Sequence, residues 1–340
     1  MKAAVFVGQE KPLDIRSWPD PEPGPGEIVV KVAACGVCHT DLHYIDHGVP
    51  TVKKPPMILG HEASGTVAKL GKDVKQFKEG DAVLLPAVLT CGYCDACRVG
   101  RENICQNMVM FGNHVDGAYA EYVKAPAKDA FHVPEEIPLQ DASIIADAVS
   151  TPFHAVKNRG QVRPGDRVAV FGCGGVGINA VQVAAAAGAT VYAVDMVEEK
   201  LSMARELGAA YTIDASKEER PGKALKKKTG GGVDIAFEVI GNPKVILEAF
   251  SGVKTGGRMV VVGYTHKDVP FNGGRIMFRE MEVVGSLGCR PVDYPRIIEM
   301  VRTGAIRVTP LIAGRFPLEK ANDAFDALRS GKGFRNLITP

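Results

Sequence analysis

The stretch "VAVFGCGGVGINAV", residues 168–181, decides the fold of the second half of this chain. It sets Gly172, Gly174 and Gly177 in G-x-G-x-x-G spacing between an apolar strand and a helix rich in Ala and Val. The first glycine permits a tight turn, the second lets backbone approach a pyrophosphate, and the third lets the helix pack closely on its strand. The helix N-terminus then presents free N–H groups to negative charge. The predicted dinucleotide-binding residues are Gly172, Gly174, Gly175, Val176 and Gly177.

Asp195 ends the next apolar strand, 18 residues after Gly177, close to the distance at which a carboxylate reaches an adenosine ribose. Its charge would repel a 2′-phosphate. No Arg follows it directly, and Lys200 stands five positions further on. We therefore expect NAD rather than NADP, with Asp195 and Lys200 on the cofactor side. The alternative is a glycine-rich turn followed by an unrelated strand-end Asp.

The pattern of apolar residues along the chain changes at about residue 165. Before it, short strands are separated by Gly and Pro, as in "EIVVKVAACGV" (27–37), which predicts a β-rich domain. After it, apolar strands alternate with helical patterns, as in "VYAVD" (191–195) and "EEKLSMARELGA" (198–209). Such alternation predicts parallel βαβ units, so the fold class is α/β. The last stretch returns to mixed helix and strand.

The 340-residue chain has an ordinary globular composition, with 46% apolar and 24% charged residues. Its net charge of +2 gives no broad positive field, so we expect no nucleic-acid partner and no anionic membrane partner. The start lacks a secretory signal, and no segment approaches the roughly 18 apolar residues of a membrane span. We expect a cytoplasmic protein, in which the eight cysteines are ligands or core residues rather than disulfides.

Four of these cysteines lie in "CGYCDACRVGRENIC" (91–105), at Cys91, Cys94, Cys97 and Cys105. Four thiolates on one short lobe complete a tetrahedral Zn²⁺ and leave no coordination position for a substrate. A structural zinc is therefore predicted. An iron–sulfur cluster or adventitious thiols are the alternatives, although the seven-residue gap fits neither usual ferredoxin spacing.

A second set of metal-ligand side chains comes from "CGVCHTDLH" (35–43) and "GHEASG" (60–65). These two motifs, the four-cysteine lobe and the glycine loop, in this order, resemble the zinc-dependent alcohol dehydrogenases of the medium-chain dehydrogenase/reductase family over essentially the whole chain. The resemblance implies a GroES-like catalytic domain at 1–148 with its zinc lobe at about 91–105, a Rossmann domain with a doubly wound parallel sheet at 149–288, and a return to the catalytic domain at 289–340.

The resemblance also implies a catalytic zinc held by Cys38, His61 and a third ligand that is commonly Cys. This chain has no Cys between Cys105 and Cys173, and Asp147 stands where that thiol would be, as in the secondary-alcohol branch of the family. Burying a carboxylate among apolar side chains is unfavourable unless a cation neutralises it. The alternative is that Asp147 caps the helix starting near Ser150. Glu62 could also enter the metal shell.

Further roles follow from the same resemblance. Thr40 would hydrogen-bond the alcohol oxygen and pass its proton by way of the cofactor ribose to His43, while Asp41 would orient His61. His39 would reach the pyrophosphate, where other members carry Arg. The remaining expected cofactor contacts are Thr151, Arg335 as a phosphate-binding residue, and Arg290, for which a surface role is the alternative.

The expected reaction is a reversible hydride transfer between an alcohol and NAD⁺, giving an aldehyde or ketone. Pro86 and Ala87 stand where many relatives carry a large aromatic residue, so secondary, branched, allylic, ring or acyl-CoA-linked alcohols remain open. Zinc-independent quinone or enoyl reductases lack the Cys38/His61 pair, and a non-catalytic NAD-binding protein is the other alternative. We expect two zinc ions per chain, and a homo-oligomer, either a tetramer or a dimer.

Overall fold

The computed structural model describes all 340 residues, which form two compact units. Unit 1 comprises Met1–Ser150, Gly288–Gly304 and Val308–Pro340, and unit 2 comprises Thr151–Leu287 and Ala305–Arg307. The first boundary thus falls at 150/151 rather than at the expected 148/149. The expected return at 289–340 differs at Ala305–Arg307, because Gln182 of unit 2 exchanges two hydrogen bonds with the backbone of Arg307, of 2.8 and 3.1 Å.

Unit 1 is rich in strands, as its short Gly- and Pro-bounded apolar runs predict. Its strands are β1 (Lys2–Phe6), β2 (Asp14–Ser17), β3 (Glu27–Gly36), β4 (Met57–Ile58), β5 (Glu62–Leu70), β6 (Ala82–Leu85), β7 (Val88–Leu89), β8 (Val109–Met110), β9 (Tyr122–Pro126), β10 (Phe131–His132), β17 (Ile312–Pro317) and β18 (Arg335–Thr339). Its helices are α1 (His39–Ile45), α2 (Asp95–Arg98), α3 (Leu139–Ala142), α10 (Tyr294–Arg302) and α11 (Ala321–Arg329).

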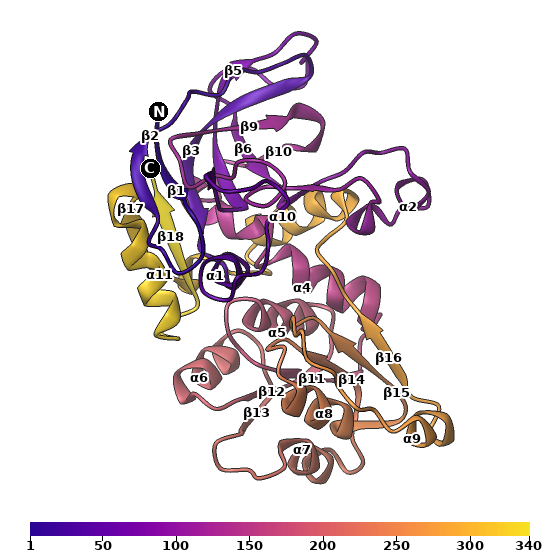
Figure 1. The fold of residues 1–340 in the computed structure, drawn as a ribbon. Coiled ribbons are helices and arrows are strands. Elements are labelled where there is room, and N and C mark those ends of the chain that lie inside the picture. Colours follow the sequence, from indigo (N-terminus) through magenta and orange to yellow (C-terminus); the bar gives the residue numbers. More distant parts are fainter. The chain divides into compact units, whose positions relative to one another are not determined.

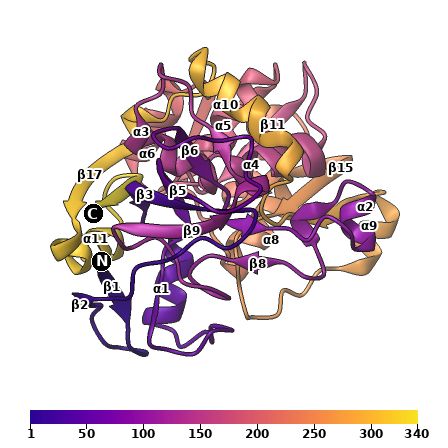
Figure 2. The same cartoon turned by 90° about the horizontal axis from the view of Figure 1, so that it is seen from above.

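The largest sheet of unit 1 has the order β10-β6-β5-β3-β18-β17, with β9 also paired to β3. The C-terminal strand β18 therefore lies against β3, and helix α11 lies beside β17 and β18 (Figures 1 and 2). Phe325 and Leu328 of α11 belong to the same buried core as Ile338 of β18. The C-terminal segment thus completes the fold of the N-terminal one.

Unit 2 is a doubly wound α/β fold. Its six strands have the order β13-β12-β11-β14-β15-β16, and every neighbouring pair is parallel. The strands are β11 (Arg167–Phe171), β12 (Thr190–Asp195), β13 (Tyr211–Asp214), β14 (Val233–Glu238), β15 (Val253–Val261) and β16 (Glu282–Gly285). The helices are α5 (Gly177–Ala186), α6 (Glu198–Glu206), α7 (Pro221–Thr229), α8 (Pro243–Gly252) and α9 (Gly273–Phe278), while α4 (Ser150–His154) crosses the unit boundary.

Most expected elements are present, with shifted ends. The strand expected at 27–37 is present as β3, which ends one residue earlier, at Gly36. No helix combines the length and the apolar character that crossing a bilayer would require.

Candidate functional site

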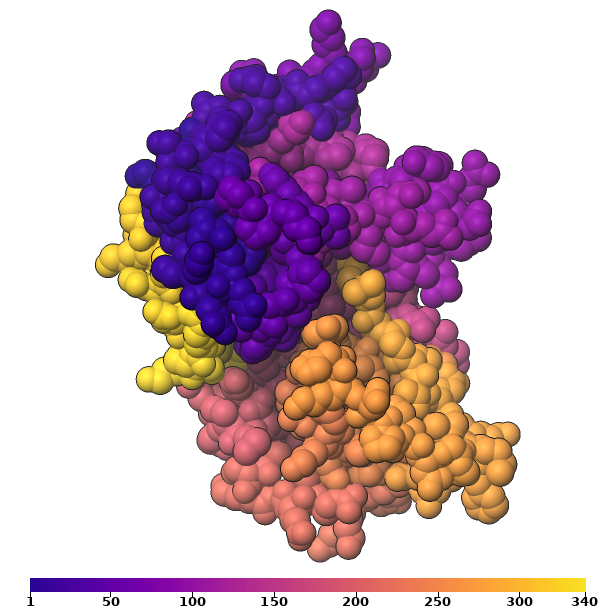
Figure 3. Space-filling model, in the orientation of Figure 1, coloured from indigo at the N-terminus to yellow at the C-terminus, as the bar shows by residue number.

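The four cysteines of the lobe come together in unit 1, on and around α2. Their sulfurs are separated by 3.4 Å (Cys91–Cys105), 3.5 Å (Cys94–Cys97), 3.8 Å (Cys94–Cys105) and 3.9 Å (Cys91–Cys97). A disulfide would need about 2.05 Å, whereas tetrahedral ligands at Zn–S bonds of about 2.3 Å stand roughly 3.8 Å apart. The lobe forms a projection at the surface of unit 1 (Figures 1 and 3). The sulfur spacing fits a four-thiolate zinc site.

Backbone groups prepare these sulfurs for ionisation. The N–H of Cys94 donates to Cys91 Sγ at 3.4 Å, and the N–H groups of Cys91 and Asn107 donate to Cys105 Sγ at 3.4 and 3.3 Å. Desolvation alone would raise the pKa of Cys91, but hydrogen bonds from backbone N–H groups outweigh this effect and lower the pKa to about 6. Desolvation and the hydrogen bond to Cys94 instead raise the pKa of Cys97 to about 12. A cation would relieve this competition among neighbouring thiols.

The second cluster also forms within unit 1 and brings together Cys38, His61, Glu62 and Asp147, whose ligand atoms all lie within 4.8 Å of one another. Cys38 precedes α1, His61 and Glu62 stand at the start of β5, and Asp147 follows the short 3₁₀ helix Ser143–Ala146. Asp147 Oδ2 lies 3.8 Å from Cys38 Sγ and 3.7 Å from His61 Nε2. This oxygen therefore faces the two expected ligands.

The donor set of this cluster fits a divalent cation. Both ring nitrogens of His61 are buried without a hydrogen-bond partner, which is costly for polar atoms. Burial alone would lower the pKa of His61, but Asp41, Asp147 and Cys38 raise it well above its usual range. The same concentration of negative groups would attract a metal ion, and one sulfur, one nitrogen and carboxylate oxygens are all zinc ligands.

Two further side chains, Asp41 and Tyr119, lie behind the ligand His61. Tyr119 donates from its hydroxyl to Asp41 Oδ2 at 2.8 Å, and Asp41 Oδ1 lies 3.6 Å from His61 Nδ1. Gly60 has a φ of +95°, and a Cβ there would approach the Tyr119 ring to 2.8 Å, so only glycine fits before His61. Sequence reasoning named Asp41 but missed Tyr119, because no local pattern links residues 78 positions apart.

Arg335 lies deep in unit 1 rather than at a surface. Its guanidinium is 2.8 Å from Glu62 Oε1 and donates to the carbonyl of Val37 at 3.1 Å. Desolvation would lower the pKa of Arg335, but the charges of Glu62, Cys38 and Asp147 raise it. Desolvation raises the pKa of Glu62 to about 7, against the opposing charge of Arg335. Glu62 therefore forms a buried ion pair with Arg335 and also lies beside Cys38, His61 and Asp147.

The expected relay residues lie on α1 beside Cys38. Thr40 Oγ1 is 3.6 Å from Cys38 Sγ. His43 is half-buried, and its Nδ1 lies 3.0 Å from Nδ1 of the exposed His47, so one of the two rings must carry the shared proton. His39 is exposed at the first position of α1. His47 was not predicted, although its four-residue offset from His43 is a helical signal.

The glycine loop of unit 2 has the predicted local geometry. Gly172 adopts a φ of +94°, and a Cβ on Gly177 would stand 1.7 Å from the carbonyl oxygen of Gly172. A Cβ on Gly174 would meet no atom within 4 Å, so the loop is open on that side. Gly175 and Val176 complete the turn into α5. An open, glycine-lined turn before a ten-residue helix fits a pyrophosphate.

Asp195 closes the same end of the sheet. Its carboxylate accepts hydrogen bonds from the backbone N–H of Cys173, at 2.7 Å, and of Val197, at 3.0 Å. Each carboxylate oxygen retains a further lone pair for a ribose hydroxyl. Lys200 is half-buried on α6, and Thr151 is the first residue of unit 2.

Arg290 is engaged within unit 1. Its guanidinium donates to Asp293 at 3.0 Å and to the carbonyl of Gly100 at 3.4 Å, which ties the returning segment to the zinc lobe. These contacts account for the residue structurally, and the expected cofactor contact of Arg290 stays a prediction.

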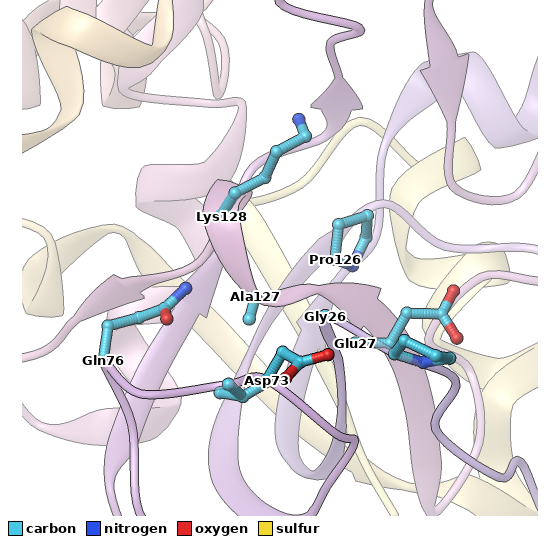
Figure 4. A pocket seen from close by; sticks show the side chains of 9 residues that line it. Gly26, Glu27, Asp73, Gln76, Pro126, Ala127 and Lys128 are labelled. Carbon is cyan, nitrogen blue, oxygen red and sulfur yellow. The ribbon is translucent and has the colours of Figure 1, made fainter.

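A surface pocket of unit 1 lies among Gly26, Glu27, Asp73, Pro126 and Lys128 (Figure 4). None of the predicted site residues lines it. Two of its charged side chains are paired locally, since Glu27 lies 3.0 Å from Lys124 and Lys128 lies 2.7 Å from Asp129. The pocket therefore offers no ligand set comparable to the two clusters.

Two protein families match the sequence. The family described as "Alcohol dehydrogenase GroES-like domain" matches residues 24–135, and "Zinc-binding dehydrogenase" matches residues 175–303. An alcohol dehydrogenase of Geobacillus stearothermophilus is 39% identical over 334 residues, which is 98% of this chain and 96% of the relative.

Solved structures are similar over the whole length. A 2R,3R-butanediol dehydrogenase from Bacillus subtilis has a TM-score of 0.90 at 30% identity, covering 100% of this chain and 99% of that one. A zinc-binding dehydrogenase from Sinorhizobium meliloti, bound to NADP, has a TM-score of 0.92 at 31% identity, with coverages of 100% and 99%.

Proposed function

This chain belongs to the zinc-type alcohol dehydrogenases of the medium-chain dehydrogenase/reductase family, and from that premise we propose that it oxidises secondary alcohols reversibly to ketones with NAD⁺. The general activity, zinc-dependent hydride transfer between an alcohol and a nicotinamide cofactor, is that of the family. The proposal concerns the substrate class, the choice of NAD⁺ and the residues responsible. The single observation that carries it is the convergence of Cys38, His61 and Asp147 in one cluster, in which Cys38 and His61 are buried and the Asp147 side chain is 20% exposed.

We assign the catalytic zinc to Cys38, His61 and Asp147 and the structural zinc to the four cysteines of the lobe. Three protein ligands leave one position open for a substrate, whereas four thiolates leave none. Glu62 is the fourth member of the cluster, and its pairing with Arg335 argues for keeping it outside the ligand set. When bound at the first site, zinc supplies Lewis acidity that favours the ionised form of an alcohol.

The chain's own residues handle the proton and the orientation. Thr40 lies beside Cys38 and would hydrogen-bond an alcohol oxygen, and His43 would be the base that takes up the released proton. Asp41, itself held by Tyr119, keeps the His61 ring oriented. The glycine loop and Asp195 hold the dinucleotide, with Asp195 selecting NAD⁺ by repelling a 2′-phosphate.

Two features favour secondary alcohols as substrates. One is Asp147 at the third ligand position, and the other is the pair of small residues Pro86 and Ala87 after β6. Pro86 and Ala87 are both buried. The name of the butanediol dehydrogenase is consistent with such a substrate.

We further propose a homo-oligomer, dimer or tetramer, because α9 buries none of its residues and leaves Met277 and Phe278 73% and 83% exposed. The thiolate sites require a reducing compartment, so we propose the cytoplasm.

Two measurements test the proposal. Metal analysis of the purified protein should find close to two zinc ions per chain, and Cys38→Ser should lose one of them. A panel of primary and secondary alcohols, followed by NADH absorbance with NAD⁺ or NADP⁺, should give higher kcat/KM for secondary alcohols and for NAD⁺. A single zinc that survives Cys38→Ser would refute the catalytic site, and faster turnover of ethanol would refute the substrate class.

A further inference from the structure

The short segment carrying Asp147 ends a 3₁₀ helix, Ser143–Ala146, and Asp147 itself leaves the helical conformation with φ −139° and ψ −54°. The carbonyl of Ala146 is therefore among those that a helix leaves without a backbone partner. Two side chains donate to it instead: the hydroxyl of Tyr294 at 2.7 Å and the hydroxyl of Ser150 at 2.9 Å. These two hydroxyl oxygens are themselves 3.2 Å apart.

Tyr294 comes from a distant part of the chain and is fixed on its own side. It begins α10 in the returning segment, 148 residues from Ala146, and is almost wholly buried. Its ring stacks on Phe131 of β10, with centroids 5.1 Å apart and an interplanar angle of 14°. A stacked ring has little freedom, so the direction of its hydroxyl is set by the sheet of unit 1.

The carbonyl of Ala146 and the N–H of Asp147 belong to one planar peptide group. Fixing the carbonyl therefore fixes the plane from which the Asp147 side chain departs. The Asp side chain is short, and a zinc–oxygen bond tolerates only about 2.0–2.2 Å, so a small shift of this plane is felt at the carboxylate. Its Oδ2 now lies 3.7 Å from His61 Nε2.

We infer that Tyr294 is a positioning residue for the third ligand of the catalytic metal, acting through the Ala146 carbonyl and together with Ser150. This inference rests on the proposed function, because it takes Asp147 to be that ligand. Tyr294 touches neither substrate nor cofactor in this role. Its hydrogen bond to the Ala146 carbonyl restricts the movement of the Asp147 carboxylate relative to the metal.

The test replaces zinc by Co²⁺ in the full-length protein and records visible absorption together with the rate of metal loss to a chelator. Outer partners of metal ligands typically contribute 10–100-fold in affinity, so Tyr294→Phe should release the catalytic metal about tenfold faster. It should also shift the absorption of that site. The four-cysteine site is an internal reference whose spectrum should stay constant.

Tyr192→Phe is the matched control, since it also removes a hydroxyl from a buried, stacked tyrosine, but on β12 of unit 2. It should change neither spectrum nor metal loss. Ser150→Ala removes the other donor and should produce the same kind of shift as Tyr294→Phe. It therefore keeps the test decisive if the Tyr294 variant does not fold.

Asp147→Asn tests the proposed ligand set separately from the positioning role of Tyr294. If it and Tyr294→Phe both alter the catalytic-site spectrum, the inference is supported. If Asp147→Asn alters the spectrum while Tyr294→Phe and Ser150→Ala do not, the positioning role is overturned and the proposed ligand set stands. If Asp147→Asn also leaves the spectrum unchanged, Asp147 is not a ligand, and both the ligand set and the positioning role fall.

Discussion

The guanidinium of Arg335 lies 2.8 Å from the carboxylate of Glu62, and the two side chains are only 3% and 0% exposed. They project from β18 and β5, which flank β3 in the large sheet of unit 1. Gly36 of β3 leaves the room for this pair, because a Cβ there would stand 2.0 Å from Glu62 Oε2. The pair thus joins the C-terminal strand to the neighbourhood of the proposed catalytic metal.

The first prediction follows from this burial. Arg335→Met should lower the stability of unit 1 by about 3–5 kcal/mol, because removing one partner leaves an uncompensated buried charge. The thermal unfolding midpoint measures the loss. Arg302→Met is the control, since its partners Glu136 and Glu299 are both exposed and surface ion pairs contribute little to stability. An unchanged midpoint with a raised KM for NAD⁺ would instead favour the phosphate-binding role expected from the sequence.

The second prediction concerns the ligand type at position 147. Asp147→Ala should abolish alcohol oxidation and reduce zinc to about one ion per chain, while the fold stays intact by circular dichroism. Asp147→Cys should retain the second zinc and part of the activity, because a thiolate carries the same charge and is also a zinc ligand. An active, fully metallated Asp147→Ala variant would return Asp147 to a helix-capping role.

The four-cysteine lobe and the glycine loop were predictable because their information is local. Cys91 to Cys105 span one short lobe, and Gly172 to Gly177 span one turn, so residue spacing alone constrains the geometry. The alternation of strands and helices likewise predicted a parallel sheet in unit 2, since each βαβ unit is a local pattern. Placing Asp147 needed the family resemblance, because nothing nearby in sequence identifies it as a ligand.

The supporting side chains were not predictable, because their partners are distant in sequence. Tyr119 reaches Asp41, and Tyr294 reaches Ala146, only after the sheet of unit 1 has formed. A single buried tyrosine has no periodic or spacing signal that separates it from an ordinary core residue. The burial of Arg335 against Glu62 was not predictable for the same reason, because these two residues are also distant in sequence.

The third prediction concerns cofactor choice. Asp195→Asn should lower kcat/KM for NAD⁺ about tenfold and narrow the preference over NADP⁺, because the charge that repels a 2′-phosphate is gone while one oxygen still accepts a backbone N–H. Steady-state kinetics with both cofactors measure the ratio. Asp214→Asn is the matched control, since Asp214 ends the adjacent strand in register with Asp195. Equal changes in the two variants would exclude a specific role for Asp195.

The last prediction is a pH dependence that originates in Glu238, at the end of β14. Its Oε1 accepts from the N–H groups of Ile240 and Gly241, at 3.0 and 2.9 Å, while its Oε2 is buried without a partner. Burial raises the pKa of Glu238, although these backbone groups oppose the rise. The folded protein therefore holds this proton more tightly than the unfolded chain does.

Because the folded pKa is raised, the contribution of Glu238 to stability should fall as pH rises above the unfolded value of about 4.3. Glu238→Gln keeps an oxygen acceptor and cannot ionise, so its thermal midpoint relative to the native protein should rise between pH 4 and pH 7. Glu282→Gln is the control of opposite sign, because Arg258 lowers the pKa of the exposed Glu282. If Glu238→Gln instead lost stability toward pH 7, the ionised carboxylate would be the form that the loop of Ile240 and Gly241 requires.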